Sequence, residues 1–499
     1  MIRDFEHCYR AVRSRDARFD GWFFTAVSTT GIYCRPSCPA ITPKRGNTSF
    51  YPTAAAAQRA GFRACKRCRP DAVPDSPEWD ARADLAGRAM RLIADGVVDR
   101  EGVAGLARRL AYTERHLHRM LVAQVGAGPI ALARARRAHT ARLLVETTEL
   151  PITEVAFAAG FSSIRQFNDT FREVFASAPR ELRRSRRGRG KGAPGEISLR
   201  LPFRKPFDLN VLLGFLGDRA VEGVEALSGG TYRRTLRLPR GAGVVTLSDG
   251  GDHVQCVLGL ADLRDLGPAV QRCRRLLDLD ADPVAVDEVL GNDQLLGPLV
   301  RRSPGRRVPG SVDGSELAVR AVLGQQVSVA GARTLAGRLV AGYGEPLPES
   351  LAAPKEGLTH LFPELAAIEE AASHDFAVPA ARRETLRRLA HALAEGEILL
   401  DPGTDREGAE RKLLALRGVG PWTASYIAMR ALGDPDAFLP TDLGVKRAAG
   451  KLGYPEDPGS LDRIAERWRP WRSYAVQQLW DSLDSVVDDR KTEREREIA

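Results

Sequence analysis

Four cysteines near the start of the chain constrain its fold more than any other feature. Cys34 and Cys38 form one pair, Cys65 and Cys68 form another, and residues 39–64 separate the two pairs. Two thiol pairs with this spacing fit a tetrahedral site in which four cysteines hold one zinc ion. The spacing alone favours a zinc ion with a purely structural role. The odd total of 7 cysteines in 499 residues argues against a disulfide scaffold and indicates a reducing compartment.

The chain is long enough for several domains, and its pattern indicates a multidomain, mainly α-helical protein. Short β-like runs lie at 232–238, 244–248 and 253–258, and helical periodicity dominates much of the remainder. We expect five segments: a small α+β zinc domain at 1–78, a helical domain at 82–185, a basic flexible linker at 186–196, a small α+β domain of sheet and helices at 197–309, and an all-α domain at 310–489.

Charge and hydropathy indicate where the protein acts. The chain has no apolar run of about 18 residues and its N-terminus lacks an apolar signal core, so we expect a cytoplasmic protein with no membrane partner. Most of the net charge of +10 falls between residues 101 and 189. A basic excess concentrated in one region usually indicates a nucleic-acid partner, although a solvated basic face would look the same.

This basic region contains two similar helical units. A short helix at 103–110 precedes a second helix that Thr113 can cap, and a helix starting at Ile152 precedes one that Ser162 or Ser163 can cap. Helix, turn and capped helix together are typical of a helix-turn-helix. On the last helix we expect Ile164, Phe167, Phe171 and Phe175 to face inward. Four polar side chains at the helix tips could read base edges: Arg115, His116, Arg165 and Gln166.

A glycine-rich hairpin and a later aspartate stand out in the C-terminal region. Gly418 and Gly420 lie between two helices, where small residues let the backbone approach phosphate and the next helix N-terminus supplies amides. Asp442 follows about twenty residues later. One interpretation is that Asp442 or Thr441 caps a helix. The other is that the Asp442 carboxylate has a catalytic role.

The cysteine segments TGIYCRPSCP, at 30–39, and GFRACKRCRPD, at 61–71, resemble the N-terminal domain of the Ada family. The resemblance implies that Cys34 accepts a methyl group from a DNA phosphotriester. It also implies that one Zn²⁺ is held by Cys34, Cys38, Cys65 and Cys68. Methylating one thiolate would make such a centre less negative and could raise its affinity for DNA, as an electrostatic switch. We expect the remaining thiols to be ordinary buried cysteines.

The helical region resembles the AraC-type DNA-binding domain with its double helix-turn-helix, including the segment FREVFASAP at 171–179. This resemblance implies binding to double-stranded DNA at promoters. It also makes RNA polymerase a candidate partner and transcriptional activation a candidate function.

The C-terminal region resembles AlkA, a DNA-3-methyladenine glycosylase of the helix-hairpin-helix superfamily, across 197–485. The segments LGFL at 213–216, VLGQQVS at 322–328 and ERWRPWRSYA at 466–475 carry the resemblance. It implies that Asp442 faces the sugar and that Gln326 fills the gap left by a flipped base, although Gln326 is polar where an apolar wedge would be expected. The implied aromatic base pocket consists of Phe215, Trp422, Tyr426 and Trp480.

Together these features predict a bifunctional protein that excises N-alkylated purines and regulates transcription after methyl transfer to Cys34. The alternative is a non-enzymatic zinc transcription factor with a degenerate glycosylase module, which would not be expected to retain Asp442. An RNA-binding protein is disfavoured because no RNA-module signature is present. No cysteine follows Cys273, so direct reversal of O6-methylguanine by a second reactive cysteine is not expected.

Overall fold

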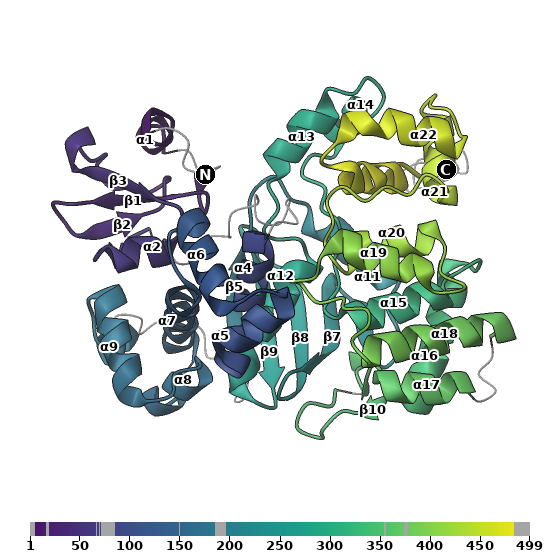
Figure 1. Ribbon diagram of the computed structural model, residues 1–499, viewed down its shortest axis with the longest axis horizontal. Coiled ribbons are helices and arrows are strands. Elements are labelled where there is room, and N and C mark those ends of the chain that lie inside the picture. Colours follow the sequence, from purple (N-terminus) through teal and green to yellow (C-terminus); the bar gives the residue numbers. More distant parts are fainter. Residues whose placement is uncertain are drawn as a thin grey trace, which may run out of the picture. The chain divides into compact units, whose positions relative to one another are not determined.

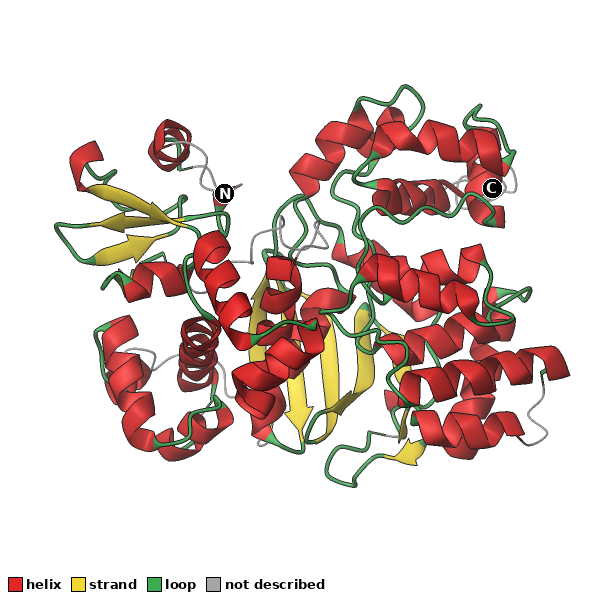
Figure 2. Cartoon of the chain, viewed as in Figure 1, coloured by secondary structure: helices red, strands yellow, loops and turns green. Residues whose placement is uncertain are grey.

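The computed structural model (Figure 1) describes residues 5–15, 19–65, 67–68, 70, 85–148, 150–184, 196–353, 356–373 and 378–483. The chain divides into two compact units. Unit 1 comprises Met1–Phe203, Glu222–Arg274 and Glu345–Phe362, and unit 2 comprises Arg204–Val221, Arg275–Gly344 and Pro363–Ala499. Figure 2 shows that most elements are helices, which confirms the predicted multidomain, mainly α-helical class. None of the described helices is long and apolar enough to cross a membrane.

The N-terminal part of unit 1 is a small α+β structure, as predicted. Its four-stranded sheet has the order β3-β1-β2-β4. The strands are β1 (Phe24–Val27), β2 (Ile32–Cys34), β3 (Thr48–Tyr51) and β4 (Arg63–Ala64), and the helices are α1 (Phe5–Arg13) and α2 (Ala54–Arg59). Thr53 caps α2 by accepting a hydrogen bond from the backbone amide of Ala56. The cysteine pairs lie at the ends of β2 and β4, so this sheet determines where the thiols meet.

The helical part of unit 1 contains both predicted helix-turn-helix units. Its helices are α4 (Leu85–Ala94), α5 (Val97–Leu110), α6 (Glu114–Val125), α7 (Pro129–Thr147), α8 (Ile152–Ala158), α9 (Ile164–Phe175) and α10 (Pro179–Arg184). Gly102 breaks α5 with a φ of 71°, so the expected helix at 103–110 is the part after the break. Thr113 caps α6, and Ser163 rather than Ser162 caps α9.

The prediction for one face of α9 was partly wrong. Phe167, Phe171 and Phe175 are buried, as expected, but Ile164 is 38% exposed. The reason is its position in the first turn, where residues 162–166 are all exposed and the helix packs against the core only from Phe167 onward.

A five-stranded antiparallel sheet with the order β5-β9-β8-β7-β6 completes the main architecture of unit 1. The three predicted β-like runs correspond to β7 (Thr231–Leu238), β8 (Gly241–Asp249) and β9 (His253–Leu260). Two strands were not predicted, β5 (Glu196–Pro202) and β6 (Glu225–Ser228). The alternation of Ile197, Leu199 and Leu201 is a strand signal that could have identified β5. The sheet is accompanied by helix α12 (Leu266–Leu276) and a two-stranded ribbon, β10 (Glu345–Pro346) and β11 (His360–Leu361).

Unit 2 is helical. Its helices are α11 (Leu209–Asp218), α13 (Pro283–Gly291), α14 (Gly297–Arg302), α15 (Gly314–Leu323), α16 (Val329–Tyr343), α17 (Leu365–Ser373), α18 (Ala380–Ala394), α19 (Arg406–Ala415), α20 (Pro421–Arg430), α21 (Leu443–Lys451), α22 (Pro458–Ala465) and residues 472–483. Trp468 is fully buried in its core and donates from Nε1 to Oδ2 of Asp293 at 2.8 Å. Trp468 is therefore a core residue.

The stability of unit 2 should depend on pH through Asp287 on α13. Burial raises the pKa of Asp287 to about 6, against an opposing hydrogen bond from the backbone amide of Gly305. The folded state therefore holds this proton more tightly than the unfolded chain, and stability is lost as pH rises from about 4 to about 6. Asp287→Asn cannot ionise, so its thermal midpoint relative to the wild type should rise across this range. Tryptophan fluorescence would measure the two midpoints, and a constant difference would contradict the prediction.

Candidate functional site

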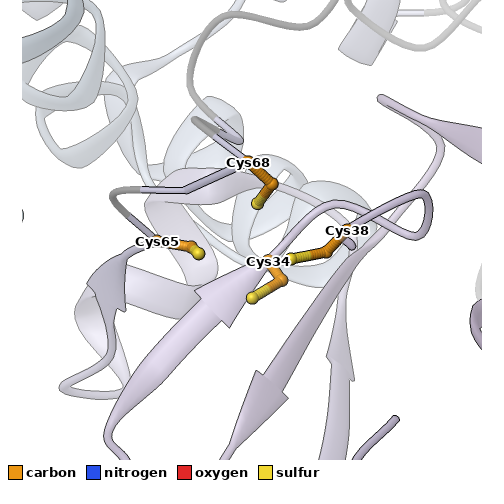
Figure 3. Close-up of side chains that lie close together, drawn as sticks. All are labelled: Cys34, Cys38, Cys65 and Cys68. Atoms are coloured by element: carbon orange, nitrogen blue, oxygen red, sulfur yellow. The ribbon is translucent and has the colours of Figure 1, made fainter. Parts of the chain in front are cut away.

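Strand pairing brings the four cysteines together in unit 1. β2 and β4 are parallel, and Tyr33 pairs with Ala64, so Cys34 and Cys65 follow at the same end of the two strands. The four thiol sulfurs of Cys34, Cys38, Cys65 and Cys68 lie within 4.8 Å of one another (Figure 3). A tetrahedral zinc ion with Zn–S bonds of about 2.3 Å places its sulfurs about 3.8 Å apart. The cluster therefore has the size that one Zn²⁺ requires.

The electrostatics of the cluster also fit a metal site. Hydrogen bonds with Cys38 and Cys68, together with burial, raise the pKa of Cys34 far above its ordinary value. The hydrogen bond from Cys34 lowers the pKa of Cys38. Without a metal, the four thiols cannot all lose their protons easily, because several thiolates this close repel one another. A divalent cation would remove that repulsion, and four sulfur donors suit Zn²⁺.

The thiols differ in accessibility. Cys38, Cys65 and Cys68 are buried, with at most 9% of their surface exposed, whereas Cys34 is only partly buried. Cys34 is therefore the sulfur most open to a molecule outside the cluster.

Sequence reasoning missed Asp20, which supports the turn between Cys34 and Cys38. This buried carboxylate accepts hydrogen bonds from the backbone amide of Ser37 at 2.9 Å and from its hydroxyl at 2.5 Å. It also lies 3.5 Å from Nε of Arg35. Its sequence signal is weak: it is an acidic residue within an aromatic-rich stretch. Sequence patterns do not reveal its role, because its partner Ser37 lies 17 residues further along the chain.

The four predicted DNA-reading side chains occupy equivalent places. Arg115 and His116 lie in the first turn of α6, Arg165 and Gln166 lie in the first turn of α9, and all four are exposed. The ring of His116 stacks on Tyr112 with centroids 5.0 Å apart. The arrangement presents one polar helix tip from each helix-turn-helix unit, and base contacts stay a prediction.

In unit 2, Asp442 both caps a helix and faces the aromatic residues. It is the N-cap of α21, and Oδ1 accepts a hydrogen bond from the amide of Val445 at 2.9 Å. Oδ1 also accepts from Nε1 of Trp480 at 2.9 Å, and Oδ2 accepts from Nε1 of Trp422 at 2.8 Å. The two interpretations of Asp442 are therefore compatible, and the cap is Asp442 rather than Thr441.

The four predicted pocket aromatics lie together around this carboxylate. Trp422 and Tyr426, one turn apart on α20, stack with ring centroids 5.2 Å apart and planes 11° apart. Phe215 of α11 and Trp480 are nearly parallel, with centroids 6.3 Å apart, and Tyr426 lies 6.5 Å from Trp480. Electron-rich ring faces attract cations, so this cluster suits a flat, positively charged ligand.

Two arginines and one glycine at the same place were not identified from sequence. Arg430 is buried and donates to the Tyr426 hydroxyl at 2.8 Å, and the guanidinium of Arg219 lies 3.7 Å from the Phe215 ring centroid. Residues 422, 426 and 430 follow one face of α20, a spacing that could have indicated Arg430. Gly444 lets Trp480 approach, because a β-carbon there would lie 3.0 Å from both that indole and Oδ1 of Asp442.

The glycine hairpin lies between α19 and α20. Gly418 has a φ of +94°, and a β-carbon there would lie 2.0 Å from Oγ1 of Thr385. Gly420 is the N-cap of α20 in extended backbone, with open space around its α-carbon. Gln325 donates to the carbonyl of Gly418 at 3.0 Å, and its exposed neighbour Gln326 has a φ of 54°. The geometry thus requires glycine at 418 but not at 420.

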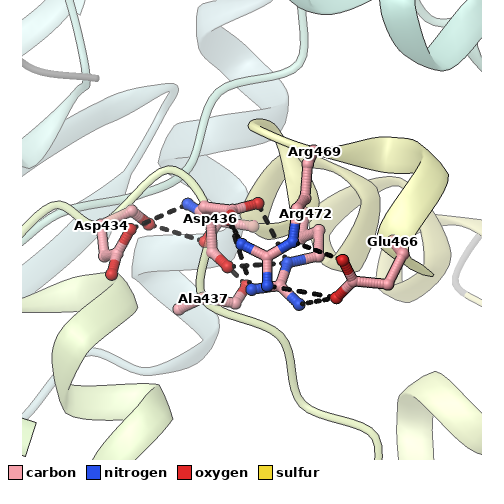
Figure 4. A network of polar contacts seen from close by, with 7 residues as sticks. Asp434, Asp436, Ala437, Glu466, Arg469 and Arg472 are labelled. Carbon is pink, nitrogen blue, oxygen red and sulfur yellow. Dashed lines mark hydrogen bonds and ion pairs between the residues drawn. The ribbon is translucent and has the colours of Figure 1, made fainter. Parts of the chain in front are cut away.

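A polar network fixes the loop that leads to Asp442 (Figure 4). Ser473 donates to the backbone carbonyls of Asp434 at 2.6 Å and Ala437 at 2.9 Å. Arg472 donates to Oδ1 of Asp436 at 3.0 Å, and Arg469 pairs with both Asp436 and Glu466. The segment before Trp480 is therefore tied to the segment before Asp442.

Three family models match the chain: the metal binding domain of Ada at residues 7–71, a helix-turn-helix domain at 106–185 and the AlkA N-terminal domain at 198–313. A Mycobacterium tuberculosis protein named "probable bifunctional transcriptional activator/DNA repair enzyme AlkA" is 57% identical over 491 residues, which are 98% of each chain. DNA-3-methyladenine glycosylase 2 of Escherichia coli is 37% identical over 56% of this chain and 95% of its own.

The solved structure of a 3-methyladenine DNA-glycosylase from Archaeoglobus fulgidus shares the fold, with a TM-score of 0.50 and 23% identity over 56% of this chain and 97% of that one. The Mycobacterium tuberculosis relative matches along nearly its whole length, through the Ada-type and AlkA-type parts alike. The chain therefore belongs to the family of bifunctional transcriptional activator/DNA repair enzymes AlkA, in which an Ada-type metal-binding domain and an AlkA-type domain share one polypeptide.

Proposed function

We propose that the protein repairs alkylated DNA by excising N-alkylated purines such as 3-methyladenine, and that methyl transfer to Cys34 makes it a transcriptional activator. The observation that carries the excision is the Asp442 carboxylate, held by two indole N–H groups inside the aromatic cluster. A non-enzymatic protein with a degenerate glycosylase module could cap α21 equally well with asparagine, serine or threonine, so it would not need a charged side chain in this position. We also propose double-stranded DNA and RNA polymerase as partners, the cytoplasm as the location, and the five segments given above as domains.

The excision needs charge stabilisation more than proton donation. When the bond between C1′ and the base nitrogen breaks, its electron pair neutralises the positive charge of the alkylated base, and positive charge develops on the sugar. Asp442 would stabilise that charge from nearby. Water then adds to C1′ and loses a proton to solvent. Phe215, Trp422, Tyr426 and Trp480 would hold the cationic base by about 0.5–2 kcal/mol for each ring.

The target base must leave the stack to reach this pocket. Gly418 and Gly420 would hold the phosphate backbone through the hairpin and the N-terminus of α20. Gln326, exposed on the turn between α15 and α16, would fill the space left in the duplex. Its amide offers hydrogen bonds to the opposite base, which an apolar wedge could not.

The zinc centre would act once per molecule. Cys34, Cys38, Cys65 and Cys68 would hold Zn²⁺, which keeps their sulfurs as thiolates at neutral pH. Sγ of Cys34 attacks the methyl carbon of a phosphotriester, the O–CH₃ bond breaks, and its electron pair stays on the phosphate oxygen. The formal charge of the centre changes from −2 to about −1, which weakens its repulsion of DNA phosphates. The partial exposure of Cys34 supports its role as the acceptor.

Asp442→Asn should abolish excision while sparing DNA binding. The asparagine carbonyl can still accept from Val445 and keep the cap of α21, but the negative charge is lost. We expect release of 3-methyladenine to fall by a factor of about 10²–10³ or more. Chromatography of released bases would measure the loss, and a mobility shift with undamaged duplex would show unchanged binding. Full activity in this variant would refute the role of Asp442.

Gly418→Ala should destabilise the hairpin, whereas Gly420→Ala should not. Alanine at 418 would collide with Thr385 and adopt a left-handed conformation, which costs roughly 1–2 kcal/mol. Gly420 has neither constraint, so it serves as the matched control for thermal stability. The double variant Gly418→Ala, Thr385→Ala should recover only the part due to the collision. Equal thermal midpoints for the two single variants would contradict this interpretation.

Incubation with duplex carrying methyl phosphotriesters should add one methyl group to Cys34. Mass spectrometry of the peptide that contains Cys34 would detect it, and unmethylated duplex provides the control. Prior removal of zinc by a chelator should prevent the transfer, because the thiolate state is lost. An unmodified Cys34 in the zinc-loaded protein would be inconsistent with the methyl-acceptor function.

A further inference from the structure

The two oxygens of the Asp442 carboxylate are held differently. Oδ1 accepts two hydrogen bonds, from the Val445 amide and from Trp480, both at 2.9 Å. Oδ2 accepts one, from Nε1 of Trp422 at 2.8 Å. A carboxylate has about four acceptor positions. Three are filled by these donors, which leaves one position on Oδ2 for the sugar.

This asymmetry makes the two tryptophans unequal. If the Trp480 N–H is lost, Oδ1 is still held by the backbone of α21 and Oδ2 by Trp422. If the Trp422 N–H is lost, no other described residue donates a hydrogen bond to Oδ2. The torsion about the Cβ–Cγ bond of aspartate is soft, so the carboxylate plane could then turn within the range that the two hydrogen bonds at Oδ1 allow.

We propose that Trp422 is the positioning residue of Asp442, whose indole N–H fixes Oδ2 and so aims its open acceptor position at the deoxyribose. This role is additional to stacking against a base, and it rests on the glycosylase function proposed above. Trp480 contributes its ring to the pocket, but its N–H duplicates a restraint that Val445 already provides.

Trp422 is itself rigidly supported. It is the second residue of α20, and its ring stacks on Tyr426 with planes 11° apart. The hydroxyl of Tyr426 accepts a hydrogen bond from Arg430, whose other nitrogens donate to the backbone carbonyls of Pro309 and Gly310. Arg430 is 4% exposed. A continuous series of contacts thus connects the core of unit 2 to Oδ2 of Asp442.

The test compares Trp422→Phe with Trp480→Phe in the full-length protein. Each variant keeps an aromatic ring and loses one indole N–H that is bonded to Asp442, so each is the matched control of the other. Single-turnover excision would be measured on duplexes carrying a cationic base, 7-methylguanine, or a neutral base, hypoxanthine. For Trp422→Phe we expect the rate constant to fall about 10- to 100-fold for both bases, because the lost N–H acts on Asp442 whatever the charge of the base. For Trp480→Phe we expect a smaller loss that depends on the charge of the base.

A binding measurement provides a readout that does not depend on turnover. Duplex with a pyrrolidine abasic nucleotide places a positive charge where the sugar cation forms, and the tetrahydrofuran analogue is neutral. Trp422→Phe should reduce the preference for the cationic analogue about tenfold and leave the Kd for the neutral one within about twofold, whereas Trp480→Phe should keep most of the preference. Binding of the neutral duplex also shows that the variant is folded. If Trp422→Phe does not fold, Trp422→Tyr can be used in its place, because tyrosine also keeps a ring and lacks the indole N–H.

The outcomes separate this proposal from the function on which it rests. If wild-type protein releases neither base, the glycosylase function itself fails. If the wild type is active and the two Phe variants lose equal amounts of activity, or if the loss in Trp422→Phe is confined to the cationic base, then Trp422 only stacks and the positioning role is wrong. An unchanged preference for the cationic analogue in Trp422→Phe would overturn it as well.

Discussion

The C-terminal half depends on keeping one ionised carboxylate in place among aromatic rings. A half-buried charge is tolerated only when its hydrogen bonds are satisfied, and Asp442 satisfies three of them with two indoles and a helix cap. That requirement explains why α20, α21 and residues 472–483 converge at one point. It also explains the polar network around Asp436, which holds the loop before Asp442. In the N-terminal half the clustered negative groups are four sulfurs, and there a cation rather than hydrogen-bond donors would hold them in one site.

Local features were predictable because their causes are local. The caps at Thr113 and Ser163 and the strands β7 to β9 each follow from a few neighbouring residues. The four cysteines lie in two segments, and their gathering was predictable because the spacing of the two pairs suits one zinc ion. The clustering of Phe215, Trp422, Tyr426 and Trp480 was predictable from resemblance, although these residues come from distant segments.

Features that depend on distant partners were harder to predict. Asp20 has its role through Ser37, and Arg430 through Tyr426. The exposure of Ile164 depends on where α9 first meets the core, which periodicity does not reveal. For Asp442, sequence offered a cap and a catalytic carboxylate as alternatives, and only the three-dimensional contacts show that one side chain can cap α21 and still face the aromatic residues.

The two-residue register between β2 and β4 has a consequence for how the halves respond to metal supply. So short a pairing contributes little to holding Cys34 beside Cys65, and metal binding would add directly to the free energy that holds the two cysteine pairs together. None of the residues assigned to excision is a proposed zinc ligand. A shortage of zinc would therefore prevent methyl transfer to Cys34 without stopping base excision. A cell short of zinc would keep base repair but lose transcriptional activation in response to methylated DNA.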